Sequence, residues 1–261
     1  MRRSTADFMD TLIEDALERV RSGYYSFKEG LNEGKRSLVD FILKCEHAAV
    51  IAEIKPVSPS LGRLMHTDDF AGVAKAMELG GAAGVSVLTE PKRFKGSLKA
   101  LFDVKRAVKI PVLMKDIFLD PIQVETASKL GADAILLIHS AITRAGRSTS
   151  DMIELAHSEG LEVLLEVQDP EEFRVAVRSD ADLIGINNRD LRTLEVTLKR
   201  TEIILKRESS LGKIVVSESG IRSAEDIKYL RKCGARAFLV GSAIMLAEDI
   251  ERKVRELVMA L

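Results

Sequence analysis

The sequence has little of what several classes of protein require. Tryptophan is absent, and the 261 residues include only two cysteines and four histidines. Cys45 and Cys233 stand far apart, without the close spacing of a metal site or the density of a disulfide-stabilised secreted domain. The histidines are scattered, so no group of Cys, His and Asp predicts a metal ligand set. We therefore expect structural thiols in a reducing compartment and no metal site.

Excess charge and long apolar runs are also missing. With 39 basic and 40 acidic residues the formal net charge is −1, whereas nucleic-acid binding depends on clustered Lys and Arg in excess. No apolar run reaches the roughly 18 residues of a membrane-spanning helix. Arg2 and Arg3 precede Asp7 and Asp10 instead of an apolar stretch, unlike a signal peptide. The sequence predicts a cytoplasmic protein that binds neither nucleic acid nor membranes.

The sequence does contain ample core material, with 46% hydrophobic residues. A length near 250 residues is typical of a single β/α barrel. From residue 48 onward, short apolar runs rich in β-branched residues alternate with helical stretches, as buried parallel strands do. The eight runs are residues 50–54, 84–88, 111–114, 134–138, 162–167, 183–186, 214–217 and 237–240.

Helix boundaries between these runs support the same order. Asp120 and Asp169 each precede a proline, which places an N-cap before Pro at the first helical position. Residues 223–226 resemble a capping box. Glycines stand where three helices should end, at Gly80, Gly131 and Gly234. The pattern predicts an α/β fold, a single (β/α)8 TIM barrel, and lacks the Gly-rich fingerprint of an open dinucleotide-binding sheet.

Residues 1–47 differ from the rest of the chain. Thr5 is a candidate N-cap for an amphipathic helix, and a second helical stretch covers about 35–44. We interpret residues 1–47 as an N-terminal helical extension packed on the barrel, and residues 48–261 as the (β/α)8 barrel. An amphipathic membrane anchor is the alternative, but the acidic polar face of the first helix disfavours it.

Ionisable residues end the odd-numbered strands of the predicted barrel. Glu53 and Lys55 end the first, Lys115 the third, Glu166 the fifth and Glu218 the seventh. Alternate strands share one interior layer, and barrel active sites lie at the C-terminal ends of the strands. Rim salt bridges would explain any one of these residues, but five together predict an acid–base site. Burial and nearby carboxylates shift a lysine pKa in opposite directions, and the sequence leaves that balance open.

Two loops near the end of the barrel have the composition of a phosphate site. Ser219-Gly220 follows the seventh strand and Gly241-Ser242 the eighth. Glycine lets backbone N–H groups approach an anion, and a helix N-terminus favours negative charge. Each pair alone is a common turn, but these are the two loops that hold phosphate in many barrels. Ser58 in the first loop is a further hydroxyl donor.

Taken together, these residues resemble the indole-3-glycerol phosphate synthase family from about residue 48 to 246. The motifs, in chain order, are 51–55 (IAEIK), 58–60 (SPS), 86–90 (SVLTE), Phe94 with Gly96, 111–116 (PVLMKD), 185–191 (GINNRDL) and 217–221 (SESGI). In this order they are highly specific. The helical N-terminal extension is also a family feature.

The resemblance implies a reaction of tryptophan biosynthesis on a phosphorylated small molecule. The substrate would be 1-(2-carboxyphenylamino)-1-deoxyribulose 5-phosphate, whose ring closes onto the ketose carbonyl before carbon dioxide and then water leave, forming indole-3-glycerol phosphate. Lys115 would be the general acid on the carbonyl oxygen and Glu166 a general base or proton partner. Glu53 and Lys55 would form a second acid–base pair that serves dehydration.

The resemblance also implies roles in orientation and binding. Asn187 and Glu218 would orient and polarise the reacting groups. The substrate-pocket positions are Phe94, Arg189 and Leu191, and the phosphate positions are Ser58, Ser219, Gly220, Gly241 and Ser242. Core packing is the alternative for Leu191, and a surface ion pair for Arg189. No metal or organic cofactor is implied, because the reaction needs only proton transfers in a closed pocket. We expect a monomer or a weak homo-oligomer.

The chain departs from the family pattern at two positions. Pro56 stands after Lys55, where a polar residue is usual, and stiffens the first loop. Ile117 stands where Phe is usual, with Phe118 next, which puts the expected aromatic contact in doubt. His139 follows the fourth strand, and we interpret it as a bystander rather than a site residue.

Two other functions are the alternatives on sequence grounds. Another sugar-phosphate barrel, such as phosphoribosylanthranilate isomerase, would share the phosphate loops but would not need two lysines and three glutamates in these motifs. A catalytically inactive phosphate-binding barrel should have lost at least one ionisable residue, and none of the expected residues is missing.

Overall fold

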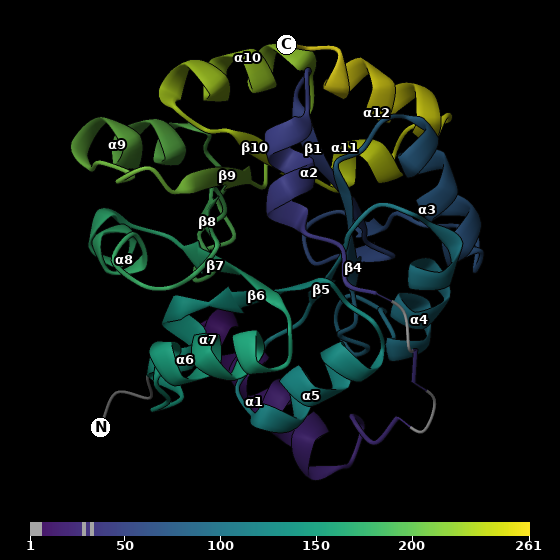
Figure 1. Cartoon of the computed structure of the whole chain (residues 1–261), viewed down its shortest axis with the longest axis vertical. Coiled ribbons are helices and arrows are strands. Elements are labelled where there is room, and N and C mark those ends of the chain that lie inside the picture. The colour runs from purple at the N-terminus through teal and green to yellow at the C-terminus, as the bar shows by residue number, and fades with distance from the viewer. Residues whose placement is uncertain (1–6, 28–29, 32–33) are drawn as a thin grey trace.

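Eight parallel strands close into a barrel in the computed structural model, which describes residues 7–27, 30–31 and 34–261 (Figure 1). The order around the barrel is β1-β10-β9-β8-β7-β6-β5-β4. The strands are β1 Ala49–Ile54, β4 Gly84–Leu88, β5 Val112–Lys115, β6 Ala134–Ile138, β7 Glu162–Val167, β8 Leu183–Asn187, β9 Ile214–Glu218 and β10 Ala237–Val240. The prediction of a (β/α)8 TIM barrel is confirmed, with each predicted strand end displaced by one residue at most.

Helices surround the barrel and connect its strands (Figure 1). They are α3 Phe70–Leu79, α4 Leu98–Ala107, α5 Pro121–Lys129, α6 His139–Arg144, α7 Thr149–Ser158, α8 Pro170–Ala176, α9 Lys199–Arg207, α10 Ala224–Cys233, α11 Ser242–Met245 and α12 Ile250–Val258. The loop after β1 contains a short antiparallel pair, β2 (Val57–Ser58) and β3 (Gly62–Arg63). Among the helices in the described ranges, none combines the length and apolar character needed to span a bilayer.

The predicted helix signals act as local physics requires. The side chains of Asp120 and Asp169 accept hydrogen bonds from backbone N–H groups in the first turns of α5 and α8. Ser223 and Asp226 form a reciprocal capping box at α10. Gly234 ends α10 with a φ of 114°, a left-handed conformation that glycine adopts without a Cβ clash. These signals fix where each helix starts and stops between the strands.

The first helix, α1 (Phe8–Arg21), lies at the C-terminal ends of the strands. Its N-cap is Asp7, which forms a capping box with Asp10. The predicted cap, Thr5, lies outside the described residues. The reciprocal bonds of Asp7 and Asp10 explain why the helix begins at Phe8.

A second N-terminal helix, α2 (Leu38–Lys44), covers the opposite end of the barrel. Leu38 packs against Gly84, the first residue of β4, where a Cβ would lie 2.8 Å from Leu38 Cδ1. Glu162, the first residue of β7, accepts hydrogen bonds from the backbone N–H groups of Leu38 and Val39. The predicted stretch of about 35–44 therefore begins as a helix only at Leu38, after Ser37 as N-cap.

A buried ion pair lies near the same end of the barrel. Lys105 Nζ on α4 is 2.6 Å from Asp133 Oδ1, and both side chains are fully buried. The Asp133 carboxylate also accepts hydrogen bonds from the backbone N–H groups of Val112 (2.8 Å) and Arg36 (2.7 Å). One carboxylate thus joins the start of β5, helix α4 and the chain that leads into α2.

We expect Lys105→Met to lower the free energy of unfolding by about 3–5 kcal/mol, because it leaves the buried Asp133 carboxylate without its ammonium partner. Lys99→Met on the same helix is the matched control, since Lys99 and Asp103 form an exposed pair. That pair is worth about 0.3–0.5 kcal/mol. Urea unfolding followed by circular dichroism measures both. Equal losses in the two variants would contradict the structural role of the buried pair.

Candidate active site

An ammonium group lies between carboxylates at the C-terminal end of the barrel. Lys115 Nζ on β5 is 3.1 Å from Glu53 Oε2 on β1 and 3.3 Å from Glu218 Oε2 on β9. Lys55 Nζ lies 2.5 Å from the other Glu53 oxygen. The structure therefore brings together, from alternate strands, residues that are far apart in the sequence.

Two further predicted residues complete this cluster. Glu166 near the end of β7 accepts a hydrogen bond of 2.9 Å from the Asn187 side-chain amide at the end of β8. Asn187 stands beside Glu218 in the register of β8 and β9. All three side chains are buried. Glu166 and Glu218, on alternate strands, point into one interior layer, and Asn187 on the strand between them reaches Glu166 through its side-chain amide.

Glycines make room for the carboxylates. A Cβ on Gly185 in β8 would lie 2.1 Å from Glu218 Oε1, and a Cβ on Gly241 would lie 2.5 Å from Glu53 Oε1. Both positions are therefore closed to any larger residue unless a carboxylate moves. Gly241, predicted as a phosphate position, thus also leaves the space that the Glu53 carboxylate occupies.

Charge interactions outweigh burial for the central pair. Burial lowers the pKa of Lys115. The carboxylates of Glu53, Glu218 and Glu166 raise it by more, so the net pKa lies above the usual range of a lysine. Burial works against ionisation of Glu53, yet the ammonium groups of Lys115 and Lys55 hold its pKa at about 2. This settles the balance that the sequence left open, because the lysine stays protonated and Glu53 stays ionised.

The other two carboxyl groups shift the opposite way. Burial raises the pKa of Glu166, and it raises that of Glu218 to about 8; Lys115 offsets only part of the effect. Repulsion between carboxylates packed around one lysine adds to the shift. Near neutral pH the cluster therefore contains an ammonium donor, an ionised acceptor and a protonated carboxyl in one largely buried layer, which is a setting for proton transfer.

Above the cluster lies a small cavity of about 70 Å³. Its charged floor is formed by Glu53, Lys55, Lys115 and Glu166, and Ser58 also lines it. Apolar side chains form the wall: Phe8, Leu12, Leu88, Phe94, Ile117, Ile138 and Leu191. The cavity thus offers an apolar surface beside acid–base groups.

Sequence reasoning missed part of this wall. Phe8 and Leu12 were identifiable as the apolar face of a helix, but nothing in the sequence places that face against the cavity. Ile117 stands in the wall at the position where the resemblance predicts Phe, whereas Phe118 is buried in the hydrophobic core. Phe118 therefore does not replace the missing aromatic contact.

An open cleft of about 630 Å³ continues from the cavity and shares its lining of Lys55, Lys115 and Arg189. The predicted phosphate loops line it through Ser219, Gly220, Gly241 and Ser242. The backbone turns through left-handed conformations at Ser219 (φ 65°) and Gly220 (φ 83°). A non-glycine residue held in that region is typical of functional sites.

Two cations in the cleft escaped the sequence analysis. Arg222, just after the Ser219-Gly220 turn, and Lys253 on α12 both line it. Arg222 is close in sequence to a predicted phosphate residue, a signal that was available. Lys253 lies 11 residues after Ser242, and only the packing of α12 brings it there.

Other residues singled out in the sequence lie outside the cavity. His139 Nδ1 forms a hydrogen bond of 3.0 Å with Thr149 Oγ1, which agrees with its interpretation as a bystander. The Pro56 carbonyl accepts hydrogen bonds from the backbone N–H groups of Leu64 (2.9 Å) and Met65 (3.1 Å). Pro56 thus anchors the base of the first loop.

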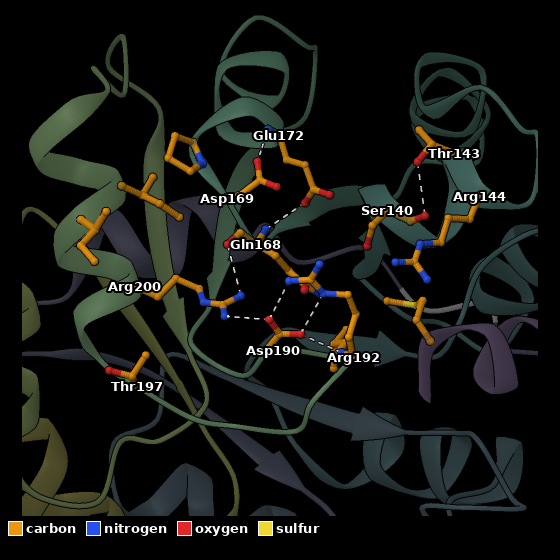
Figure 2. A pocket seen from close by; sticks show the side chains of 15 residues that line it. Ser140, Thr143, Arg144, Gln168, Asp169, Glu172, Asp190, Arg192, Thr197 and Arg200 are labelled. Atoms are coloured by element: carbon orange, nitrogen blue, oxygen red, sulfur yellow. Dashed lines mark hydrogen bonds and ion pairs between the residues drawn. The ribbon is translucent and has the colours of Figure 1, made fainter. Parts of the chain in front are cut away.

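A second cleft, of about 530 Å³, lies beside the site between α6 and the loops after β7 and β8 (Figure 2). Its floor includes Asp190, which pairs with Arg192 (3.0 Å) and Arg200 (3.3 Å). Leu191 lines both this cleft and the reaction cavity. The Asp190 pairs therefore hold the loop that carries Arg189 and Leu191.

A β/α barrel with a cluster of Lys and Glu at its C-terminal rim, beside a cleft lined by cations and Gly-Ser turns, is typical of one class, the barrel enzymes that act on phosphorylated small molecules. The profile of one family, described as indole-3-glycerol phosphate synthase, matches residues 10–257. The chain belongs to this family.

Curated relatives agree with this assignment over nearly the whole chain. Indole-3-glycerol phosphate synthase of Methanopyrus kandleri is 44% identical over 254 residues, which cover 95% of this chain and 98% of that protein. The enzyme of the same name from Geobacillus thermodenitrificans is 40% identical over 245 residues, or 93% of this chain and 94% of that protein.

Solved structures show likeness in fold alone. Thiamine phosphate pyrophosphorylase from Pyrococcus furiosus aligns with a TM-score of 0.59 at 19% identity, covering 82% of this chain and 95% of that one. N-acetylmannosamine-6-phosphate 2-epimerase from Clostridium perfringens aligns with a TM-score of 0.59 at 17% identity, covering 82% and 93%.

We expect Glu218→Gln to become more stable relative to the wild type as pH rises. The folded wild type holds the Glu218 proton to about pH 8, whereas the unfolded chain releases it near the ordinary pKa of 4.5. Between these values the folded state binds the extra proton, so wild-type stability falls with rising pH. Glutamine does not titrate.

The relative gain across this pH window should be about 4–5 kcal/mol, because the pKa rises from 4.5 to about 8 and each pKa unit is worth about 1.4 kcal/mol; urea unfolding at several pH values measures it. The lost contact with Lys115 adds a constant offset that does not depend on pH. A difference between the two proteins that stays constant across the window would contradict the raised pKa of Glu218.

Proposed function

We propose that the charged layer at the barrel rim carries out the family's reaction, with the residues in the roles set out below. The chain is a carboxy-lyase of tryptophan biosynthesis that converts 1-(2-carboxyphenylamino)-1-deoxyribulose 5-phosphate into indole-3-glycerol phosphate. The family match favours this reaction over phosphoribosylanthranilate isomerisation or an inactive barrel. The observation that carries the residue roles is Lys115, held between Glu53 and Glu218 at the cavity floor.

Lys115 acts as general acid during ring closure. The aromatic carbon attacks the ketose carbonyl, and the carbonyl oxygen gains negative charge as the new carbon–carbon bond forms. A lysine with a raised pKa is a weak acid, so it polarises the carbonyl first and gives up its proton only when the oxygen becomes strongly basic. The ionised Glu53 keeps the ammonium charged until that point, and Glu218 holds it from the other side.

Glu166 and Lys55 carry out the proton transfers of the later steps. Loss of carbon dioxide restores the aromatic ring, and dehydration then places one proton on the leaving hydroxyl and removes one from the adjacent carbon. Glu166, whose pKa is raised by burial, is the better base. Glu53, with a pKa of about 2, serves mainly as the counterion that holds Lys55 and Lys115. Lys55 supplies the proton for the hydroxyl.

Orientation and binding come from the surrounding residues. Asn187 holds Glu166 through its 2.9 Å hydrogen bond, and Glu218 holds Lys115. The carboxyphenyl ring lies against Phe94 and Leu191 in the apolar wall. The phosphate occupies the cleft, near Arg189 and the turns Ser219-Gly220 and Gly241-Ser242, with Ser58 at the junction of cavity and cleft.

The domain division and assembly are part of the same proposal. Residues 1–47 form an extension and residues 48–261 the barrel; the packing of α1 and α2 on opposite ends of the barrel supports this division. A monomer or weak homo-oligomer in the cytoplasm stays a prediction from the sequence.

Product fluorescence tests the reaction directly. The chain contains no tryptophan, so indole-type fluorescence that grows after substrate is added comes from the product. We expect Lys115→Ala to lower kcat by about 10²–10⁴-fold, the range of general acid–base catalysis. Circular dichroism checks that the variant folds.

Lys99→Ala, at an exposed position on α4, is the control and should match the wild type. Absence of fluorescence growth with wild-type protein would overturn the proposed reaction. Wild-type rates in Lys115→Ala, with growth intact, would overturn only the role of that lysine.

Inorganic phosphate should compete with substrate, raising the apparent KM and leaving kcat unchanged. Ser242→Ala should weaken this inhibition roughly tenfold, because a hydrogen bond to a charged group is worth about 1.5–3 kcal/mol. Ser209→Ala, at an exposed position after α9, should leave the inhibition constant unchanged. An apparent KM that does not respond to phosphate would rule out the assigned loops.

A further inference from the structure

One buried side chain joins the N-terminal helix α1 to the reaction site. Arg19, in the last turn of α1, is only 7% exposed. Its guanidinium lies 3.0 Å from Glu90 Oε1 and 2.6 Å from Asp116 Oδ1, and its Nε donates to the Tyr25 hydroxyl over 3.2 Å. A planar guanidinium fixes the relative orientation of two carboxylates, which a lysine ammonium does not.

One of these two carboxylates, Asp116, stands next to the proposed general acid. Asp116 directly follows Lys115 and is buried. Its Oδ1 also accepts the backbone N–H of Ile117, and its Oδ2 accepts the Thr89 hydroxyl (2.7 Å) and the Tyr25 hydroxyl (3.1 Å). Asp116 therefore fixes the turn through which β5 leaves the barrel, immediately after the lysine.

The second carboxylate orders the turn after β4. Glu90 accepts hydrogen bonds from three successive backbone N–H groups, at Lys92 (2.9 Å), Arg93 (2.6 Å) and Phe94 (2.9 Å). Phe94 is part of the apolar wall of the cavity. The Arg19 fork thus connects the turn beside Lys115 with the turn that carries Phe94.

Docking of α1 alone does not require this arrangement. The helix is already fastened to the same loop by Asp15, which pairs with Lys92 and Arg93 at 2.6 Å each and at more exposed positions. A buried fork costs desolvation that a surface pair avoids. Burial raises the pKa of Asp116, and Arg19 is the cation that offsets this effect. The fork is therefore suited to setting geometry rather than to holding the helix down.

We propose that Arg19 is a positioning residue for the proposed reaction. It acts through Asp116 and Glu90 to set where the Lys115 ammonium and the Phe94 ring stand relative to each other. On this view α1 is a working part of the site, contributing Arg19 as well as cavity lining, and not only a cover for the barrel. The inference rests on the proposed function.

The test compares Arg19→Lys with the wild type by product fluorescence. Lysine keeps the charge but cannot hold both carboxylates in one plane. We expect kcat to fall about 10- to 100-fold, as a misplacement of catalytic groups by about 1 Å does. The inhibition constant of inorganic phosphate should stay within about twofold, because the phosphate cleft is bounded by β9 and β10 loops that Arg19 does not touch.

Two further variants keep the test decisive. Tyr25→Phe removes one hydroxyl, which Arg19 and Asp116 share with the Gln123 side-chain amide, and it should also lower kcat, even if Arg19→Lys folds poorly. Arg93→Met is the matched control, because its side chain fastens α1 through Asp15 without contacting Asp116. It should keep wild-type kcat. Melting temperatures of all three variants report whether each is folded.

The outcomes separate this inference from the proposed function. If wild-type protein forms no fluorescent product, the proposed function fails. If the wild type is active and both Arg19→Lys and Tyr25→Phe keep its kcat, the positioning role is wrong. A fall in kcat of equal size in Arg93→Met would also overturn it, because helix docking alone would then explain the loss. A parallel rise in the phosphate inhibition constant would point to general disruption instead and count against the inference.

Discussion

The site depends on one electrostatic constraint, an ammonium group held among buried carboxylates from other strands of the barrel. Lys115 stays charged there because the negative charge of its carboxylate neighbours, above all Glu53, outweighs its desolvation. One ammonium group cannot offset the burial of every carboxyl group around it. The pKa of Glu53, which also contacts Lys55, falls to about 2, whereas that of Glu218 rises to about 8. The positions of Lys115, Glu218 and Glu53 thus give three neighbouring groups different protonation states within one cluster.

The scaffold serves this cluster from both ends. At the N-terminal ends of the strands, α2 and the buried Lys105–Asp133 pair fix how the barrel closes. At the C-terminal ends, α1 closes the apolar side of the cavity, and its Arg19 fork joins the turns after β4 and β5. The Asp190 pairs with Arg192 and Arg200 do the same for the turn after β8 (Figure 2). Ion pairs at or beside the cavity thus hold the turns that carry its lining side chains.

Family membership and site geometry bear on different questions. The match over residues 10–257 and relatives at 40–44% identity establish which reaction belongs to the chain. The structure adds the particular lining of this site: Ile117 in the cavity wall, and Arg222 and Lys253 in the adjoining cleft. Ile117 keeps the wall apolar without an aromatic face. The two extra cations increase the positive charge of the cleft where a dianionic phosphate would bind.

Much of the molecule was determined by the sequence alone. Buried β-branched runs, Asp-Pro caps and helix-ending glycines are local signals, so the strands and many helix boundaries were predictable to within a residue or so. The five charged residues on alternate strands were predictable because strand periodicity and barrel closure place them in one layer. Only the tertiary structure decided which charge wins, which side chains complete the cavity, and what α1 does there. Those outcomes depend on distances between segments such as Arg19 and Asp116, 97 residues apart, and on burial, and neither is encoded in any local pattern.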